Sequence, residues 1–511
     1  MIIAVGSLTD VMSTAGEGAA QHDLGGALVL PGFQDTHLHA VEAGINADRC
    51  LLTEFGTRAQ YQNEITDCAV DQAADDWFIG AGVSMPDLLA LEPNPAAFLD
   101  GLVPDKPALI LDNLGHGAWA NTQALQAVGF DTMVGDPQGG LIDRMGSGAP
   151  SGVVYENAQQ VLRTAALPPT PENLEMNFQA LRNALTTLAE NGITTVSDAG
   201  GYWTRGHHEA WIRAEAEGVL TVRAVNAFYV FPDMPLAQQV ADITALRRDD
   251  PNALLRFDQV KIYVDGILSQ GTAALINPYD SDLGVVNVPP NGFEYFAPGE
   301  LEAYTQMFDA AGFGVHFHAT GDRGTRLALH AVEAAQAVNG SSSGRHKVTH
   351  IFLADVADHP RFAALNVTAD LQVTPTSIDT QTTNFYRTFI GTRADETIPA
   401  ASLLAAGAPM TLSSDWDADE LSPLVKIETV LTRGAESLPD VETAVRLLTI
   451  EPARYLGHDN RTGTLEVGKL ADMVVLDRDI FTIATGQIDQ TQVIGTLMNG
   501  DTVFNPNGIL P

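Results

Sequence analysis

Eight short apolar segments rich in β-branched residues recur along the chain, and most of them end in polar residues. The stretches between most of them have helical composition, as in 301–311, 326–338 and 399–406. Strands that alternate with helices favour parallel pairing through right-handed crossovers, and eight such units predict a (β/α)8 barrel. A doubly wound sheet is the alternative, but it does not need eight units. The segments are 28–39, 193–198, 221–230, 260–265, 314–318, 348–351, 366–374 and 410–415.

Two parts of the chain fall outside this alternation. Residues 41–190 are too long for a crossover and are rich in Pro and Gly, which predicts an insertion with its own small structure at the barrel mouth. Residues 1–30 and 456–511 read as short strands broken by turns, and they predict a small β-sandwich domain built from both termini. The barrel itself is expected over residues 31–455.

The charge of the chain is strongly acidic. Its 511 residues include 64 Asp and Glu against 27 Lys and Arg, a formal net charge of −37. Neither a nucleic acid nor an anionic membrane is expected as a partner, because both need a basic face. The acidity also weighs mildly against strongly anionic substrates. There is no apolar run of about 18 residues and no basic leader, so a cytoplasmic location is predicted.

The chain has only two cysteines, Cys50 and Cys68. They are too few for a disulfide framework, and their spacing is not that of a metal site. Any metal is therefore expected on His, Asp, Glu or Lys. Nitrogen and oxygen ligands favour zinc, with manganese, iron or cobalt as alternatives.

Polar residues cluster where the predicted strands end. His37 and His39 close the first segment, and the period of two along a strand points both imidazoles to the same side. Two imidazoles aimed at one point form half of a metal site, although an isolated His-x-His usually has no such meaning. The ends of barrel strands meet at the catalytic mouth of the barrel. The other residues at strand ends are Lys261, His316, His318, His350 and Asp415.

Each of these residues is a weak signal by itself. A strand histidine is more often a satisfied core residue, Lys261 could reach solvent, and Asp415 could cap the next helix. Their joint occurrence is the stronger observation. Four or five of the 13 histidines fall at the ends of strands that would converge, which a random distribution would rarely give.

Several motifs together resemble the amidohydrolase superfamily and, more narrowly, the amidohydrolase family 3 group. They cover nearly the whole chain and are specific in combination. The motifs are Leu30-Pro-Gly-Phe-Gln-Asp-Thr-His-Leu-His, Gly115-His-Gly-Ala-Trp-Ala-Asn, Lys261-Ile-Tyr-Val-Asp-Gly, His318-Ala-Thr-Gly-Asp-Arg, Thr349-His, Ser413-Ser-Asp-Trp-Asp and Gly463-Thr-Leu-Glu-Val-Gly-Lys-Leu-Ala-Asp.

The resemblance implies a centre of two divalent metal ions. Asp415 would contact the first metal and act as general base and then general acid on a metal-activated water. Lys261 would be carboxylated at its amine and bridge both ions. The histidine ligands would be His37 and His39 for the first metal and His318 and His350 for the second.

Substrate contacts are expected from a second group of residues: His116, Glu156, His316 and Trp416. His116 would hydrogen-bond a carbonyl oxygen, although a structural loop histidine is an equal alternative. Glu156 would face the mouth, whereas a surface carboxylate is the commoner fate. His316 is ambiguous because it shares a strand face with His318. Trp416 would shape an apolar pocket or simply pack.

The resemblance thus implies a hydrolase that cleaves a non-peptide C–N bond of a small molecule, most readily an amide or an N-acyl or N-formyl amine. A non-catalytic regulatory protein with the same fold is the rival hypothesis. A deaminase with one metal, or a hydrolase of (thio)carbamates, is a further alternative, and Lys261 weighs against the deaminase. Barrels of this kind often form homodimers, but no sequence feature specifies one.

Overall fold

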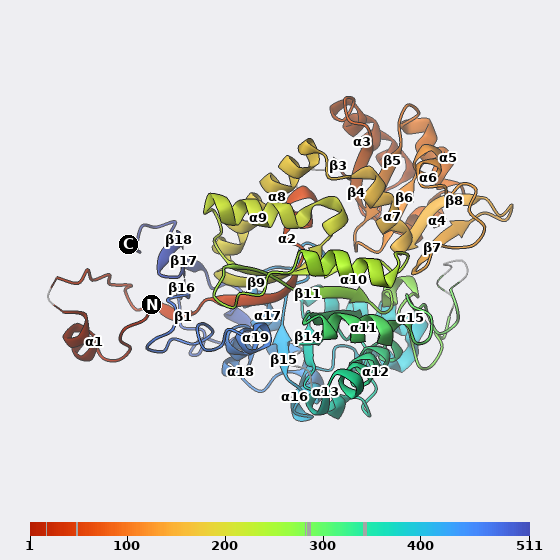
Figure 1. The fold of residues 1–511 in the computed structure, drawn as a ribbon. Coiled ribbons are helices and arrows are strands. Elements are labelled where there is room, and N and C mark those ends of the chain that lie inside the picture. The colour runs from red at the N-terminus through yellow and green to blue at the C-terminus, as the bar shows by residue number, and fades with distance from the viewer. Residues whose placement is uncertain (17, 47–49, 282, 284–287, 341–344, 511) are drawn as a thin grey trace.

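The computed structural model describes residues 1–16, 18–46, 50–281, 283, 288–340 and 345–510. Its parts lie side by side: a small terminal sheet, a central barrel and an inserted α/β unit (Figure 1). Within the described residues, no helix combines the length and the apolar character needed to cross a bilayer.

The centre of the molecule is a sheet of eight parallel strands, which confirms the predicted (β/α)8 barrel. Each strand except the last is followed by chain that contains at least one helix before the next strand begins. In spatial order the strands are β2 (Phe33–Leu38), β9 (Ile193–Gly201), β10 (Arg223–Tyr229), β11 (Leu255–Tyr263), β12 (Gly314–Ala319), β13 (Lys347–His350), β14 (Thr368–Leu371) and β15 (Met410–Leu412).

The helices around the barrel bury their apolar sides against the strands. In α8 these residues include Phe178, Leu181 and Leu185, which recur at helical spacing and are at most 2% exposed. The helices are α2 (Ala40–Asn46), α8 (Pro171–Glu190), α9 (His207–Glu217), α10 (Leu236–Ala245), α11 (Glu300–Ala310), α12 (Asp322–Asn339), α13 (His359–Leu365), α14 (Pro375–Ile378), α15 (Thr380–Ile390), α16 (Ala400–Ala405), α17 (Pro423–Thr432), α18 (Val441–Arg446) and α19 (Ile450–Leu456).

The barrel closes between its first and last strands through a short seam. The Asp415 amide donates to the His37 carbonyl at 2.8 Å, and the His39 amide donates to the Trp416 carbonyl at 2.6 Å. Below them, Asp35 Oδ1 accepts from the amides of His37 (3.0 Å) and Ser414 (3.2 Å), one on each side of the seam. The seam therefore fixes the two His-x-His residues against Asp415.

The inserted unit has a six-stranded mixed sheet of its own. Its separate apolar core surrounds Trp119, which is fully buried. Both α2 and α8 pack into the barrel core, so the unit with its own core begins at β3 and ends at α7. Its elements are β3 (Cys50–Leu51), α3 (Arg58–Asp71), β4 (Phe78–Val83), α4 (Met85–Leu91), α5 (Pro95–Leu102), β5 (Ala108–Asp112), β6 (Gly117–Ala120), α6 (Thr122–Ala127), β7 (Gly140–Arg144), β8 (Pro150–Glu156) and α7 (Asn157–Ala166).

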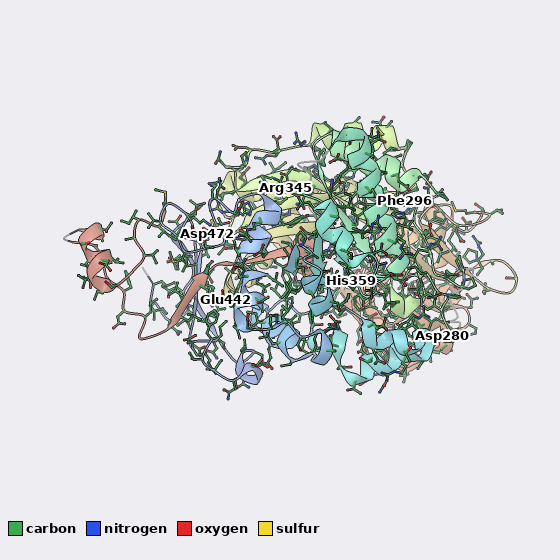
Figure 2. The ribbon with its side chains drawn as sticks, turned by 90° about the horizontal axis from the view of Figure 1, so that it is seen from below. Asp280, Phe296, Arg345, His359, Glu442 and Asp472 are labelled. Atoms are coloured by element: carbon green, nitrogen blue, oxygen red, sulfur yellow. A yellow bond between two sulfur atoms is a disulfide. The ribbon has the colours of Figure 1, made fainter. Side chains whose placement is uncertain are left out.

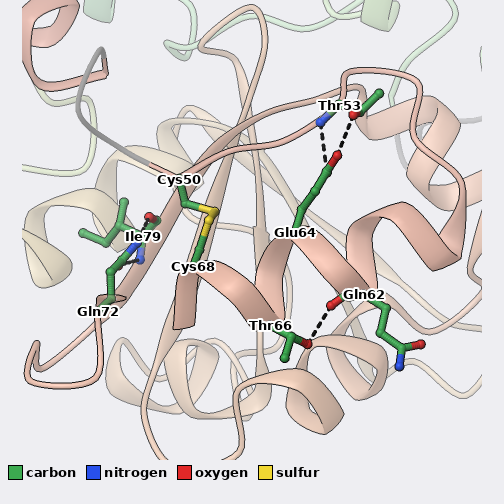
Figure 3. The surroundings of a disulfide bond; sticks show 8 residues. All are labelled: Cys50, Thr53, Gln62, Glu64, Thr66, Cys68, Gln72 and Ile79. Atoms are coloured by element: carbon green, nitrogen blue, oxygen red, sulfur yellow. Dashed lines mark hydrogen bonds between the residues drawn. A yellow bond between two sulfur atoms is a disulfide. The ribbon is translucent and has the colours of Figure 1, made fainter. Parts of the chain in front are cut away.

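The two cysteines, too few for a disulfide framework, form a single disulfide within this unit. The bond joins Cys50 in β3 to Cys68 in α3, and Glu64 on the same helix accepts from Thr53 (Figure 3). Counting cysteines could not show the pairing, because only the fold brings the short strand onto the helix. Disulfides persist mainly in oxidising compartments, so this bond points away from the predicted cytoplasmic location.

The chain ends form one antiparallel sheet, in the order β1 (Leu28–Pro31), β16 (Met473–Leu476), β17 (Val493–Met498) and β18 (Asp501–Phe504). The short strands expected before residue 25 are replaced by a helix, α1 (Leu8–Ala15), which has no buried residue and stands apart from the rest (Figures 1 and 2). An ion pair between Arg223 at the start of β10 and Asp472, just before β16, ties this sheet to the barrel.

Candidate metal centre

The His-x-His pair and Asp415 converge at the barrel seam. Asp415 Oδ1 lies 3.0 Å from His37 Nε2 and 3.2 Å from His39 Nε2. One ligand atom from each of the three residues lies within 4.8 Å of the others. His37 is fully buried, whereas the Asp415 side chain is 21% exposed and lines a pocket. The structure thus brings together the predicted ligands of the first metal.

His318 and His350 lie beside this group, at the ends of β12 and β13. Their ring centroids are 4.3 Å apart, and His350 Nδ1 lies 3.8 Å from Asp415 Oδ2. His318 Nε2 lies 3.3 Å from the Gly266 carbonyl oxygen, whereas its Nδ1 is buried without a hydrogen-bond partner among the described residues. A buried imidazole nitrogen without a partner is free to bind a cation.

Lys261 reaches the same cluster from β11. It is fully buried, and its Nζ lies 3.4 Å from each ring nitrogen of His37 and 5.2 Å from the centre of the Tyr263 ring. Burial lowers the pKa of Lys261 well below its usual range, with a further contribution from the charge of Lys347. The amine of Lys261 therefore lies within the cluster of predicted ligands.

His316 lies behind His37 and not at the pocket. Its Nε2 is 2.8 Å from His37 Nδ1, the side chain is fully buried, and it stands beside Lys261 in the sheet register. His37, His316 and Asp370 form a second group of donors within 4.8 Å. A residue on the far ring nitrogen of a ligand orients that ligand, so this geometry favours a positioning role for His316 over the substrate contact expected of it.

The electrostatics leave these side chains in forms that bind metal. Burial lowers the pKa of His37 and His318 well below its usual range, and it lowers the pKa of His350 to about 3. Burial opposes ionisation of Asp415. The charge of His37 and the hydrogen bonds from His37 and His39 nevertheless hold the pKa of Asp415 well below its usual range. Neutral imidazoles with an ionised carboxylate are the donor set of a divalent cation, which suits a metal centre here.

The insertion supplies His116 to the pocket that Asp415 lines. Its Nδ1 lies 2.7 Å from Glu156 Oε2, which also accepts from the Tyr295 hydroxyl at 2.7 Å. Glu156 Oε1 accepts from Thr272 at 2.6 Å. Glu156 is 1% exposed and does not line the pocket, so it neither faces the mouth nor lies on the surface. It holds the His116 ring, and its charge raises the pKa of His116 against the effect of burial.

Backbone conformation marks three of these residues. Glu156, His350 and Asp415 have φ of 57°, 76° and 59°, a left-handed region of backbone conformation that residues other than glycine rarely adopt. Such strain persists where surrounding contacts impose it, and it is common at functional sites. Trp416 follows Asp415, is half-buried against the barrel core and does not line the pocket, so the packing alternative describes it better.

Sequence reasoning missed two aromatic residues of the site. The Tyr263 ring stacks on His318, with ring centroids 4.3 Å apart and planes at 14°, and Tyr295 binds Glu156. Tyr263 follows Lys261 by two residues on one strand, so strand alternation could have found it. Tyr295 lies in an irregular stretch after β11, where no pattern in the sequence points to the site.

The chain was compared with known protein families. A model of the amidohydrolase family matches residues 22–504. The chain belongs to the amidohydrolase family. This membership makes it one of a family of metal-dependent hydrolases, and it agrees with the donor groups that converge at the barrel mouth.

Curated relatives of this amidohydrolase match over nearly its full length. It is 26% identical to N-substituted formamide deformylase of Arthrobacter pascens, over 99% of this chain and 94% of the relative. It is 25% identical to the protein LONG AFTER FAR-RED 3 of Arabidopsis thaliana, over 98% and 87%. An uncharacterized metal-dependent hydrolase from Pyrococcus horikoshii shares the fold, with a TM-score of 0.69 and 21% identity over 91% of this chain and 89% of that one.

Proposed function

We propose that this amidohydrolase cleaves a non-peptide C–N bond in a small molecule, and that the substrate is an amide such as an N-acyl or N-formyl amine. The observation that carries the proposal is the convergence of His37 Nε2, His39 Nε2 and Asp415 Oδ1 at the barrel seam. Lys261, His318 and His350 surround them, and the pocket opens on the same carboxylate.

Two divalent metals, most suitably zinc, would be held by this donor set. His37 and His39 would hold the first ion, His318 and His350 the second, and Asp415 would contact the first. When bound, the ions lower the pKa of water and polarise the carbonyl group of the substrate. A buried neutral amine such as that of Lys261 is the form that reacts with carbon dioxide, which supports an N-carboxylated Lys261 as the bridge.

Asp415 acts first as general base and then as general acid in this proposal. Its ionised carboxylate, exposed to the pocket, takes a proton from the attacking water as the water oxygen bonds to the amide carbon. The same carboxyl group then returns that proton to the leaving nitrogen as the C–N bond breaks. The products are a carboxylic acid, which keeps the second proton of the water until it ionises to solvent, and a free amine, which carries the proton returned by Asp415.

His116 is proposed to bind the carbonyl oxygen of the substrate. Glu156 accepts from the Nδ1 side of the ring, which turns the opposite side toward the pocket. A donor on that side would stabilise negative charge as it develops on the oxygen. Glu156 is a positioning residue here, because its three hydrogen bonds fix the ring and it does not line the pocket.

The proposal is tested first by metal content, with bicarbonate kept in the buffer, and by turnover of a panel of N-formyl and N-acetyl amines. We expect close to two divalent ions per chain, and K261M should retain fewer ions and lose at least about 100-fold in turnover. K469M, which changes a lysine of the terminal region, is the matched control. Absence of metal after reconstitution, or a fully loaded protein that hydrolyses no amide, would contradict the proposal.

A further inference from the structure

A buried group of charged residues forms one wall of the pocket, away from the proposed metal ligands. Glu42 of α2 accepts from Arg205 Nη1 at 2.9 Å and lies 3.4 Å from His207 Nε2, and its other oxygen contacts Arg163 of α7. None of these four side chains is more than 6% exposed. One carboxylate therefore faces two guanidinium groups in a place that water barely reaches.

Each of the two arginines has N–H donors for which no described residue provides an acceptor. Arg163 Nε and both Nε and Nη2 of Arg205 are buried without a hydrogen-bond partner among the described residues. A guanidinium has five N–H donors, and leaving them unfilled in a buried place is costly. Burial lowers the pKa of Arg163 to about 10, so the group is still charged near neutral pH.

Of the two arginines, Arg163 alone lines the pocket. Arg163 lines the pocket together with His116 and Asp415, whereas Arg205 lies behind it with its guanidinium carbon 3.8 Å from the centre of the Tyr202 ring. Arg163 is therefore a built-in donor on the wall of the pocket that holds the reacting groups.

We propose that Arg163 binds a carboxylate on the substrate, so that the amides hydrolysed are those that carry a carboxylate group. This inference rests on the proposed function. A guanidinium pairs with a carboxylate through two parallel hydrogen bonds, which gives both affinity and orientation.

The acidic residues of the pocket restrict the anion to a single charge. Glu42 and Asp417 line the same pocket, and the charge of Asp417 already acts on Arg163. A phosphate dianion would meet stronger repulsion from these two groups than a carboxylate does. The net charge of −37 weighed mildly against strongly anionic substrates. A buried guanidinium, however, acts on a bound anion at short range, where the acidic surface has little influence.

A matched pair of substrates tests the inference. N-formylphenylalanine and N-formylphenethylamine differ by a carboxylate alone, and their acetyl analogues form a second pair. We expect R163M to lower kcat/KM for the carboxylated member by about 30- to 100-fold, mainly through KM, and to change that of the neutral member by less than about threefold. R163K should retain part of the preference, because it keeps the charge but loses the paired donors.

The variants are chosen so that a folding defect is recognised. In R163M the Glu42 carboxylate keeps Arg205 and His207, and R213M, which removes an exposed arginine of α9, is the control. Equal losses for both members of a pair, or an unchanged ratio, would overturn the inference. If the wild-type protein hydrolyses neither member, the proposed function fails. Calorimetric binding of 3-phenylpropionate and 3-phenylpropanol to the wild type and R163M then tests whether Arg163 binds a carboxylate. Weaker binding of the carboxylate alone in R163M supports the site, and unchanged binding overturns it.

Discussion

The barrel and the insertion contribute to the same pocket in different ways. The barrel places Lys261 by strand register, and it places His37 and His39 by the backbone hydrogen bonds of the seam. The insertion places His116 by side-chain contacts, through Glu156 and the residues that hold it. A position fixed by register can be read from strand alternation, whereas one fixed by side chains depends on distant segments. Under the proposed function, bond cleavage belongs to the barrel and substrate recognition to the insertion.

The largest expected effect comes from the barrel side. D415N should lower kcat by about a thousandfold or more, because the amide cannot take and return the proton. Metal content and the unfolding temperature should change little, because the four histidines and Lys261 remain, the side-chain oxygen of Asn can still contact the first ion, and the backbone bonds of the seam are kept. Elemental analysis and thermal unfolding on the same sample check this. E442Q, which changes an exposed carboxylate of α18 that does not line the pocket, is the control (Figure 2). Near-normal turnover in D415N would remove the role assigned to Asp415.

An intermediate effect is expected from the insertion side. H116Q should lower kcat/KM by about 100-fold through loss of the carbonyl donor. E156Q should lower it by about tenfold, because the ring is still present but less firmly held. Both variants should bind metal as the wild type does, which distinguishes them from ligand variants in the barrel. A loss of metal in H116Q would break the comparison, since the insertion would then supply a ligand.

The smallest effect on catalysis is expected from the disulfide. Replacing Cys50 and Cys68 by serine opens a link across 18 positions and should lower the free energy of unfolding by about 3 kcal/mol. Turnover at low temperature should stay within about threefold, because the bond lies in the core of the insertion and away from the pocket. Denaturant unfolding and steady-state kinetics, with reduced wild type beside the variant, measure both. A loss of turnover as large as that of H116Q would show that the bond holds the pocket itself.

The sequence predicted the barrel because its signals are local. Each strand is a short apolar run with helical chain after it, and the observed strands β9 to β15 overlap the predicted segments. The first predicted segment divided into β1 and β2, since Gly32 turns the chain from the terminal sheet into the barrel. The disulfide was missed because nothing in its local sequence sets it apart. The start of α1 did carry a local signal, since Ser7 caps the helix and Asp10 follows three residues later.

In the site, too, the residues with local sequence signals were predicted and those placed by distant contacts were not. The residues at strand ends were found from spacing, and the structure brings them together. Glu156 was expected at the mouth but is buried behind His116, a place that depends on Thr272 and Tyr295 far along the chain. Arg163 gave no signal at all, because a single arginine in a helical stretch is indistinguishable from a surface residue until the fold is known.

The seam between β2 and β15 has a consequence for how this protein unfolds. Few backbone bonds close it, and the proposed ligand side chains come from both sides, with His37 and His39 at the end of β2 and Asp415 after β15. A cation bound there would link the first and last strands of the barrel. Closure of the barrel and occupancy of the centre are then thermodynamically linked, and a melting temperature describes the chain together with the free metal concentration.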